Sequence, residues 1–476
     1  MSFIQKYGLW DAQQERVARE LLERVTRDGI ELVRLSFADL HGLLRGKALL
    51  ATALPGAMRE GCAITSTLLL KDSSHRTVMP VFAPAAGVGR TPWQGGADVI
   101  MVPDPTTFRL LPWLNNTGWM LCDLYYADGT PVGLSTRNVL RRQLARLPAG
   151  QQLVTGLEVE FHILKLVDPE LSLDDGGQPG TPPRVELTHH GYQHLTEQRL
   201  DRIEPIVDIL RRYTLALGLP LHSVELEFGP SQVEFVFGTA TDMQSADAMI
   251  LFRSAVKQIC RRHGYHATFM CRPSFANAMS SGWHLHQSLA DPSGRNLFAP
   301  AVEGELLSSL GRHYLAGLLD GAIEAVAFTT PTINGYKRYR PMSLAPDRAA
   351  WSYDNRGAML RVVGAANPAT ARIENRIGEP AANPYLYLAT QLATGLAGVD
   401  AAREPPPPVD APYEAAARLL PTSLAQALDA LRAGSVLRAA LGEDFIDYYL
   451  TIKAAEQRRF ESAVTDWEMR EYFDVF

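Results

Sequence analysis

The chain has 476 residues with 46% hydrophobic and 21% charged side chains, a composition typical of a globular protein large enough for two domains. The net charge of -6 argues against a nucleic-acid partner, because phosphate binding needs a basic surface. No apolar run is long enough to cross a bilayer, and the first residues lack the apolar core of a signal peptide. We therefore expect a cytoplasmic protein that makes no contact with a membrane.

The N-terminal part of the chain is predicted to form a small domain. Residues 30–37 and 43–51 alternate apolar and polar side chains around a short turn, which predicts a β-hairpin. Strand-like runs interrupted by prolines continue to about residue 123. We place the domain boundary near residue 130, which gives domains of residues 1–130 and 131–476.

The larger domain mixes helices and strands without regular alternation. A strand is predicted over residues 157–165. Helical patterns cover residues 135–147, 197–217, 245–263 and 306–327. This order predicts an α+β protein and not a doubly wound parallel sheet.

Two glutamates mark the predicted strand that opens the larger domain. Glu158 and Glu160 are two residues apart among β-branched and aromatic neighbours, so both side chains should lie on one face of the strand. Two like charges side by side repel each other unless a cation lies between them or one is protonated. The pair is compatible with a metal site, and equally with a solvated strand face.

Two further pairs repeat this pattern. Glu227 and Glu234 lie on either side of a Gly-Pro turn and could converge on one ion, although a polar hairpin edge explains them as well. His284 and His286 again share a strand face among apolar neighbours. Each histidine could be a metal ligand or a hydrogen-bonded core residue.

Five of the arginines between residues 338 and 376 lie among apolar residues, with few acidic residues nearby in the sequence to pair with them. Among them stands Glu374, two residues from an arginine on each side. The arginines are Arg338, Arg356, Arg361, Arg372 and Arg376. Such a group suits a polyanionic ligand such as a triphosphate or a carboxylate.

In this order and spacing, these blocks resemble the glutamine synthetase superfamily, and the resemblance covers nearly the whole chain. It implies an N-terminal β-grasp domain and a larger catalytic domain built on a curved antiparallel sheet with helices. It also implies a ring-shaped homo-oligomer, perhaps a dodecamer, with active sites between neighbouring subunits. Glutamate, ATP and an amine would be the substrates, with two or three Mg²⁺ or Mn²⁺ ions in each site.

The resemblance also implies roles for individual residues. One metal site near the acyl substrate would use Glu160, Glu227 and Glu234. A second, beside the nucleotide, would use Glu158, His284 and Glu374. Arg338 and Arg376 would hold glutamate, whereas Arg356 and Arg361 would face the transferred phosphoryl group. Ser288 and Arg372 would contact the nucleotide, and His286 is assigned to the same region.

Two positions depart from the ammonia-using members of the superfamily. Those enzymes place carboxylates around ammonium, but Leu344 and Thr65 stand at the matching positions of this chain. A cationic amine entering such a pocket would lose its hydration without gaining a counter-charge. An amine that is neutral at pH 7, such as an aniline, avoids this cost, so we predict a γ-glutamyl amide of an aromatic amine, with Trp283 as a further candidate for the pocket wall.

Several alternatives remain open at this point. Asp72 or Asp347 could supply the charge that a polyamine needs, and an alkylamine, ethanolamine or ammonia could also be the acceptor. A catalytically inactive relative with a structural or regulatory role would be expected to lose metal ligands, which this chain keeps. A two-metal hydrolase unrelated to ATP would explain the carboxylates and histidines but would give no function to the arginines of residues 338–376.

Overall fold

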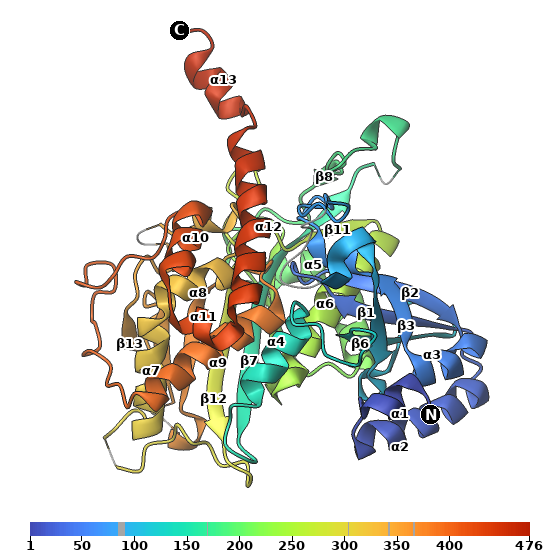
Figure 1. The fold of residues 1–476 in the computed structure, drawn as a ribbon. Coiled ribbons are helices and arrows are strands. Elements are labelled where there is room, and N and C mark those ends of the chain that lie inside the picture. Colours follow the sequence, from blue (N-terminus) through green and yellow to red (C-terminus); the bar gives the residue numbers. More distant parts are fainter. Residues whose placement is uncertain (84–90, 169, 303, 341–342, 365–366) are drawn as a thin grey trace.

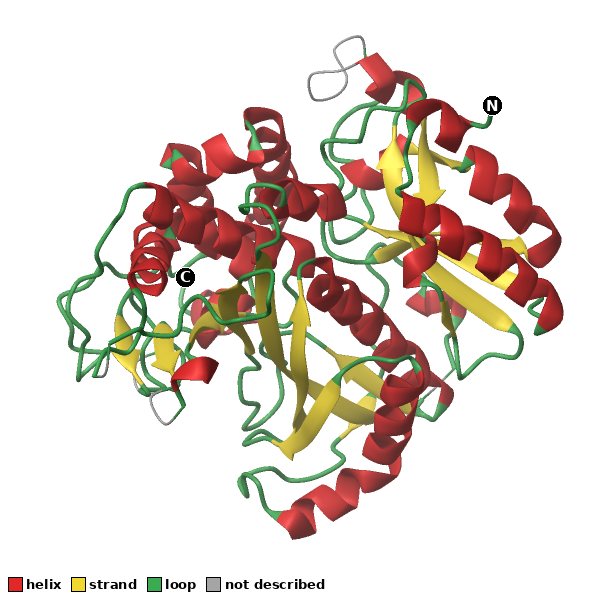
Figure 2. Ribbon diagram, turned by 90° about the horizontal axis from the view of Figure 1, so that it is seen from below, coloured by secondary structure: helices red, strands yellow, loops and turns green. Residues whose placement is uncertain are grey.

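The computed structural model describes all residues except 84–90, 169, 303, 341–342 and 365–366. It contains two β-sheets, and Figure 2 shows them side by side, each with helices packed against it. In the part of the chain that is described, no helix is both long enough and apolar enough to cross a bilayer.

The N-terminal sheet has six strands in the order β2-β1-β6-β4-β3, with β5 beside β6. The strands are β1 (Leu32–Ala38), β2 (Leu44–Leu50), β3 (Cys62–Thr65), β4 (Asp98–Pro103), β5 (Arg109–Leu110) and β6 (Thr117–Tyr125). The predicted hairpin is confirmed, because β1 and β2 pair antiparallel. β1 also pairs in parallel with β6, so the sheet is mixed. Its helices are α1 (Phe3–Tyr7), α2 (Ala12–Arg27) and α3 (Leu54–Glu60).

The second sheet has nine strands, with β7 at its centre. The main path runs β13-β14-β15-β12-β7-β10-β9, and β8 and β11 also pair with β7. The strands are β7 (Gln152–Leu166), β8 (Val185–Glu186), β9 (Leu221–Leu226), β10 (Gln232–Thr241), β11 (Tyr265–Thr268), β12 (Trp283–Ala290), β13 (Trp351–Tyr353), β14 (Leu360–Val363) and β15 (Arg372–Gly378). All of these pairings are antiparallel except that between β13 and β14.

Helices cover one face of this sheet and form the C-terminal part of the molecule. They are α4 (Thr136–Leu144), α5 (Glu197–Ala216), α6 (Met243–Arg262), α7 (Ser309–Asp320), α8 (Ala322–Thr329), α9 (Pro384–Asp400), α10 (Leu424–Ala433), α11 (Val436–Leu441), α12 (Glu443–Glu461) and α13 (Asp466–Tyr472). α9 is buried along almost its whole length, and α13 carries the C-terminus away from the body (Figure 1).

Two details of the predicted helices need correction. The single helix expected over residues 306–327 is two helices that meet at Gly321. A Cβ at Gly321 would lie 2.3 Å from the side chain of Thr394, so the glycine permits a close approach to α9. Ser135 does occupy the N-cap position of α4, but its side chain makes no capping hydrogen bond.

One buried arginine connects the two sheets. Arg137 on α4 forms ion pairs with Asp104 and Asp123 of the N-terminal sheet region and with Asp247 of α6, at 2.9, 3.0 and 2.8 Å. Burial alone would lower the pKa of Arg137, but the three carboxylates raise it well above its usual range. The cation is therefore a fixed electrostatic link between the two parts of the chain.

Candidate active site

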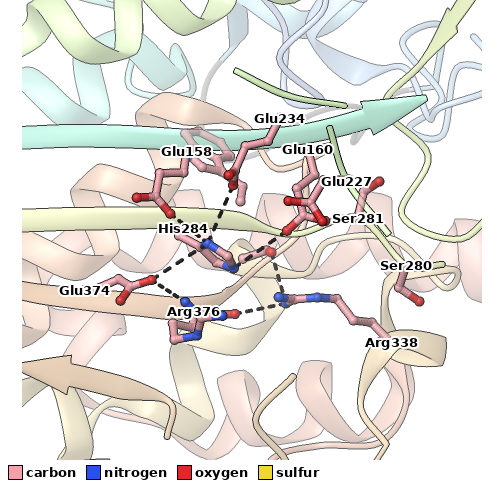
Figure 3. A network of polar contacts seen from close by, with 12 residues as sticks. Glu158, Glu160, Glu227, Glu234, Ser280, Ser281, His284, Arg338, Glu374 and Arg376 are labelled. Carbon is pink, nitrogen blue, oxygen red and sulfur yellow. Dashed lines mark hydrogen bonds and ion pairs between the residues drawn. The ribbon is translucent and has the colours of Figure 1, made fainter. Parts of the chain in front are cut away.

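The alternation of side chains along three neighbouring strands gathers the predicted ligands on one face of the large sheet. His284 of β12 lies opposite Glu158 of β7, and His286 lies opposite Glu374 of β15. Figure 3 shows Glu158 and Glu374 directed toward the imidazole of His284. Helix α9 packs on the opposite face, where Tyr387 and Gln391 contact Trp283 and Asn375.

The same alternation places Trp283 away from the site. Its ring is fully buried and packs edge to face on Tyr387 of α9, with 4.9 Å between the ring centroids. The suggestion that Trp283 lines an amine pocket is therefore wrong, because successive residues of a strand point to opposite faces.

His284 lies at the centre of four carboxylates. Its Nδ1 atom is 3.1 Å from Glu158 Oε2, 3.8 Å from Glu374 Oε1 and 3.9 Å from Glu234 Oε1. Its Nε2 atom is 3.8 Å from Glu160 Oε1. Glu158 also bonds His286 Nε2 at 2.9 Å.

Ligand atoms from these residues form two overlapping groups that could each hold a cation. One group is Glu158, His286 and Glu374, the other is Glu158, Glu234 and His284, and the atoms in each lie within 4.8 Å of one another. Both groups contain Glu158. The first differs from the set implied by the family resemblance, because it uses His286 where His284 was expected.

Glu227 lies at the edge of this cluster, in the turn between β9 and β10. Its carboxylate accepts a hydrogen bond from the backbone N–H of Phe228 at 3.2 Å, and its Oε1 atom is 3.8 Å from Nε2 of His194. Figure 3 places Glu227 beside Glu160. The Gly-Pro turn thus brings Glu227 and Glu234 to the same side of the sheet, as expected.

Burial and mutual repulsion make it unfavourable for all of the acidic side chains to be ionised at once without a cation. Burial together with Glu160 raises the pKa of Glu227 to about 8, and burial with the neighbouring glutamates raises that of Glu234 to about 10. Burial would also raise the pKa of Glu158, but hydrogen bonds with His284 and His286 hold it below its usual range. Carboxylate oxygens and imidazole nitrogens in this number fit divalent cations, whose charge would offset the repulsion.

Glu374 is held by two arginines. Arg361 Nη1 lies 3.0 Å from Glu374 Oε2, and Arg376 Nη1 lies 2.5 Å from Glu374 Oε1. Burial would raise the pKa of Glu374, but Arg376 and the two histidines lower it to about 2. Arg361 also forms an ion pair with Asp354. Two of the predicted arginines therefore lie within contact distance of the carboxylate cluster.

Arg338 borders the Glu160 side of the cluster, and Arg376 borders the Glu374 side. Arg338 is buried and its Nη1 atom donates to the backbone oxygens of Arg376 and Ile377, at 3.0 and 3.3 Å. A Cβ at Gly282 would lie 2.5 Å from Arg338 Nη2 and 3.2 Å from Glu160 Oε1. Among the described residues, nothing accepts a hydrogen bond from the buried Nε of Arg376. Buried donors of this kind suit a carboxylate ligand.

A cavity of about 460 Å³ lies next to Glu158 on the same face. The three residues assigned to nucleotide contacts, His286, Ser288 and Arg372, all line it. Arg372 Nε donates to His286 Nδ1 at 3.1 Å, which orients the imidazole toward Glu158. A somewhat larger cavity of about 480 Å³, between the first hairpin and helices α6 and α12, contains none of the predicted site residues.

The remaining predicted residues are more scattered. Leu344 is 51% exposed and Arg356 is exposed in the loop between β13 and β14. Thr65 ends β3 in the other sheet, where its hydroxyl bonds Thr67 Oγ1 and the oxygen of Gly96, at 3.0 and 3.2 Å. Within one chain, Thr65 therefore belongs to a different surface from the carboxylates.

The two acids considered for a polyamine already have partners. Asp347 forms two hydrogen bonds with Arg348, at 2.8 and 3.1 Å. Asp72 is buried, accepts two backbone hydrogen bonds and forms an ion pair with Arg459. A polyamine would have to displace these partners, which makes a cationic amine pocket at either acid unfavourable.

Sequence inspection missed one residue that organises the site. Gln232 is buried, and its Nε2 atom donates to Glu160 Oε2 at 2.9 Å and to Ser281 Oγ at 3.1 Å. Its Oε1 atom accepts from the backbone N–H of Gly229 at 2.9 Å, which fixes the turn that carries Glu227. The signal was present, because Gln232 precedes Glu234 by two residues and so shares its strand face.

The fold and this cluster define a family. Residues 133–472 match the model described as the glutamine synthetase catalytic domain. This range exceeds half of the chain, so the protein belongs to the glutamine synthetase family.

Individual relatives are similar over nearly the whole length. γ-Glutamylanilide synthase from Acinetobacter sp is 44% identical, with 100% of this chain and 99% of the relative covered. A γ-glutamylethanolamide synthetase from Streptomyces coelicolor is 33% identical over 96% of this chain and 95% of the relative. A glutamate–isopropylamine ligase from Pseudomonas sp is 32% identical over 95% and 96%. Among solved structures, a GmaS–ADP complex matches with a TM-score of 0.80 and 28% identity, covering 95% of this chain and 99% of that one.

Proposed function

We propose that this protein is an ATP-dependent ligase that joins the γ-carboxylate of glutamate to an amine through γ-glutamyl phosphate. The observation that carries the proposal is the position of Glu374, between the carboxylate cluster and two arginines. Such an arrangement suits phosphoryl transfer, which needs cations and fixed positive groups around the phosphate oxygens. The ligases and synthetases among the relatives support the same class of reaction.

The metal ligands would divide as the family resemblance implies. Glu160, Glu227 and Glu234 would hold an ion near the acyl substrate, and Glu158, His284 and Glu374 would hold one beside the nucleotide, with His286 as a further candidate. Mg²⁺ or Mn²⁺ in these positions would neutralise phosphate charge and orient the transferring group. ATP would occupy the cavity lined by Ser288 and Arg372.

The protein's own groups would then position the reactants. Arg338 and Arg376 would bind the carboxylates of glutamate, since Arg338 lies beside Gly282 and Glu160 and the buried Nε of Arg376 has no acceptor among the described residues. Arg361, with Arg356 from the neighbouring loop, would face the phosphoryl group as it leaves ATP. The γ-carboxylate attacks the terminal phosphorus, ADP departs, and the amine nitrogen then displaces phosphate from the acyl carbon.

For the amine, we propose a neutral aromatic compound such as aniline. Leu344 supplies no charge where a cationic amine would need one, and the two candidate acids, Asp347 and Asp72, are each paired with an arginine. The relative with 44% identity is named for an anilide product. An alkylamine or ethanolamine is the second candidate, because relatives at 32–33% identity are named for these amines.

We also propose the larger organisation that the family resemblance implies. Residues 1–130 would form a β-grasp domain and residues 131–476 the catalytic domain. The chains would assemble into a ring, perhaps a dodecamer, in which Thr65 of one subunit faces the site of the next. In this arrangement Thr65 would contact the amine site of the neighbouring subunit, whereas within one chain it lies away from the carboxylate cluster. A cytoplasmic location is part of the same proposal.

The decisive experiment measures ADP formation with each substrate omitted in turn. We expect release of ADP to require ATP, glutamate, an amine and Mg²⁺ or Mn²⁺ together, with aniline preferred over isopropylamine and ammonia. ADP formation that does not depend on glutamate would reject the ligase. A protein that binds ATP but forms no ADP under any combination would favour a catalytically inactive relative.

A further inference from the structure

Two aromatic rings stack on each other beside Glu227, at the edge of the carboxylate cluster. The rings of His194 and Phe228 are nearly parallel, with centroids 4.2 Å apart and an angle of 12° between their planes. Both remain open to solvent, since Phe228 is 41% exposed and the His194 side chain 34%. An exposed aromatic pair at the edge of a ligand site suggests a ring-shaped partner.

The chain is shaped to hold this pair. Phe228 lies two residues beyond the end of β9, and its carbonyl accepts a hydrogen bond from the backbone N–H of Tyr192 at 2.9 Å. The N–H of Leu195 bonds the last carbonyl of β9 at 3.2 Å. Tyr192 and Leu195 have φ angles of 70° and 54°, a left-handed conformation that is uncommon for such residues. The two bends direct the segment across the turn and bring His194 onto Phe228.

The stack borders the acyl end of the carboxylate cluster. His194 Nε2 is 3.8 Å from Glu227 Oε1, and the Phe228 N–H donates to the same carboxylate. Met279, which is 46% exposed, adds a third apolar group, because a Cβ at Gly229 would lie 3.1 Å from the Met279 Cβ. The turn that carries Glu227 thus has the aromatic stack beside the carboxylate and Met279 beside Gly229.

We propose that His194 and Phe228 form the binding platform for the ring of an aromatic amine, with the amino group directed past Glu227 toward the acyl carbon. This inference rests on the proposed ligase function and specifies how that function selects its amine. An aryl ring can stack on the platform and rest its edge on Met279, whereas an alkylamine or ammonia has no ring face to offer.

The test compares substitutions that remove or keep the ring at one position. His194→Leu and Phe228→Leu keep apolar volume but abolish stacking, and His194→Phe keeps a ring without the imidazole nitrogens. We expect both leucine variants to raise the KM for aniline about threefold to tenfold, with the KM for glutamate and for ATP changed less than about twofold. His194→Phe should retain a KM for aniline close to that of the unmodified protein. Gln198→Ala, at an exposed position near the start of α5, serves as the control and should leave all three values unchanged.

Three outcomes would overturn the platform. The first is an unchanged KM for aniline in both leucine variants, and the second is an equal rise in the KM of all three substrates. The third is a defect in His194→Phe as large as that in His194→Leu, because the imidazole nitrogens and not the ring face would then matter. Gel filtration of each variant distinguishes a subunit contact, since a changed assembly size would assign the stack to an interface. Each of these failures leaves ADP formation by the unmodified protein intact, whereas failure of the ligase itself abolishes that reaction with every amine.

Discussion

His284 Nδ1 lies 3.1 Å from Glu158 Oε2, and the two residues face each other across neighbouring antiparallel strands. Glu158 belongs to both groups of potential metal ligands and also lines the cavity of about 460 Å³ that we propose for the nucleotide. It is therefore the residue whose removal should affect the site most widely.

Glu158→Ala is expected to lower ADP formation at least about 100-fold, because it removes a carboxylate common to both groups. The fold should persist, since the change also relieves repulsion among the remaining glutamates. Thermal unfolding with and without Mn²⁺ checks this point: the unmodified protein should be stabilised by the ion and the variant much less. Glu186→Gln, an exposed carboxylate on β8, is the matched control. Near-normal turnover of Glu158→Ala would contradict the metal assignment.

The pKa values of Glu227 and Glu234 predict how the stability of the metal-free protein depends on pH. Both are raised, to about 8 and about 10, from an ordinary value near 4.5, so the folded state keeps protons that the unfolded state has lost. Stability should therefore fall between pH 7 and pH 8, by roughly 1.4 kcal/mol per pH unit for each proton retained. His284, whose pKa is lowered from 6.5, and Glu379, whose pKa is raised to about 7, act mainly below this window.

Urea unfolding at pH 7.0, 7.5 and 8.0 measures this dependence. Glu234→Gln should flatten the slope, and saturating Mn²⁺ should do the same because the bound carboxylates are then ionised. A metal-free protein whose stability is constant or rises over this interval would show that both glutamates are already ionised at pH 7.

Gly282→Ala tests the narrow gap between Arg338 and Glu160. The added methyl group would lie 2.5 Å from Arg338 Nη2, so the guanidinium must move. We expect the KM for glutamate to rise about tenfold or more, because displaced binding groups lose alignment with the reacting carboxylate. The KM for ATP should change little. Gly133→Ala is a suitable control, since a Cβ there meets nothing within 4 Å. An unchanged KM for glutamate would place its binding elsewhere.

Leu344→Glu tests the amine pocket. A carboxylate at this exposed position should favour cationic amines, raising the kcat/KM ratio of isopropylamine to aniline about twofold to fivefold, a modest effect because solvent screens the charge. Leu344→Gln has nearly the same shape without the charge and should leave the ratio unchanged. Equal ratios in the Glu and Gln variants would mean that Leu344 lies outside the amine pocket.

Arg137→Ala tests the link between the sheets. Removing the cation leaves three aspartates close together without their main counter-charge, so we expect a loss of about 3–5 kcal/mol in the free energy of unfolding. Arg141→Ala should cost much less, because that side chain is 39% exposed and pairs with Asp123 alone. Urea denaturation followed by circular dichroism compares the two variants, and equal losses would argue against a special role for Arg137.

The sequence predicted those features that depend on local periodicity. Glu158 and Glu160 lie on one strand face, as do His284 and His286, because residues two apart on a strand point the same way. The same alternation places Gln232 on the face of Glu234 and Trp283 on the face opposite His284. We did not draw either conclusion from the sequence. The break at Gly321 follows instead from close packing against α9, which local sequence does not reveal.

Long-range geometry was less accessible. The pairing of Asp72 with Arg459 joins residues 387 positions apart, so no local pattern could show that this acid is unavailable to a polyamine. The stack of His194 on Phe228 likewise depends on a loop that bends through two left-handed residues. Thr65 lies in a separate sheet, and its role depends on how chains assemble.

The pairing of β12 with β7 decides during folding whether the site forms. His284, His286 and Ser288 occupy every second position of one strand, so their placement is decided in a single step, when β12 pairs with β7. A shift of one residue would turn all three toward the helices and expose Trp283 and Leu285 instead. A register error of this strand should therefore remove the proposed metal ligands and the proposed nucleotide contact together. We do not expect misfolded molecules that bind the metal but not the nucleotide.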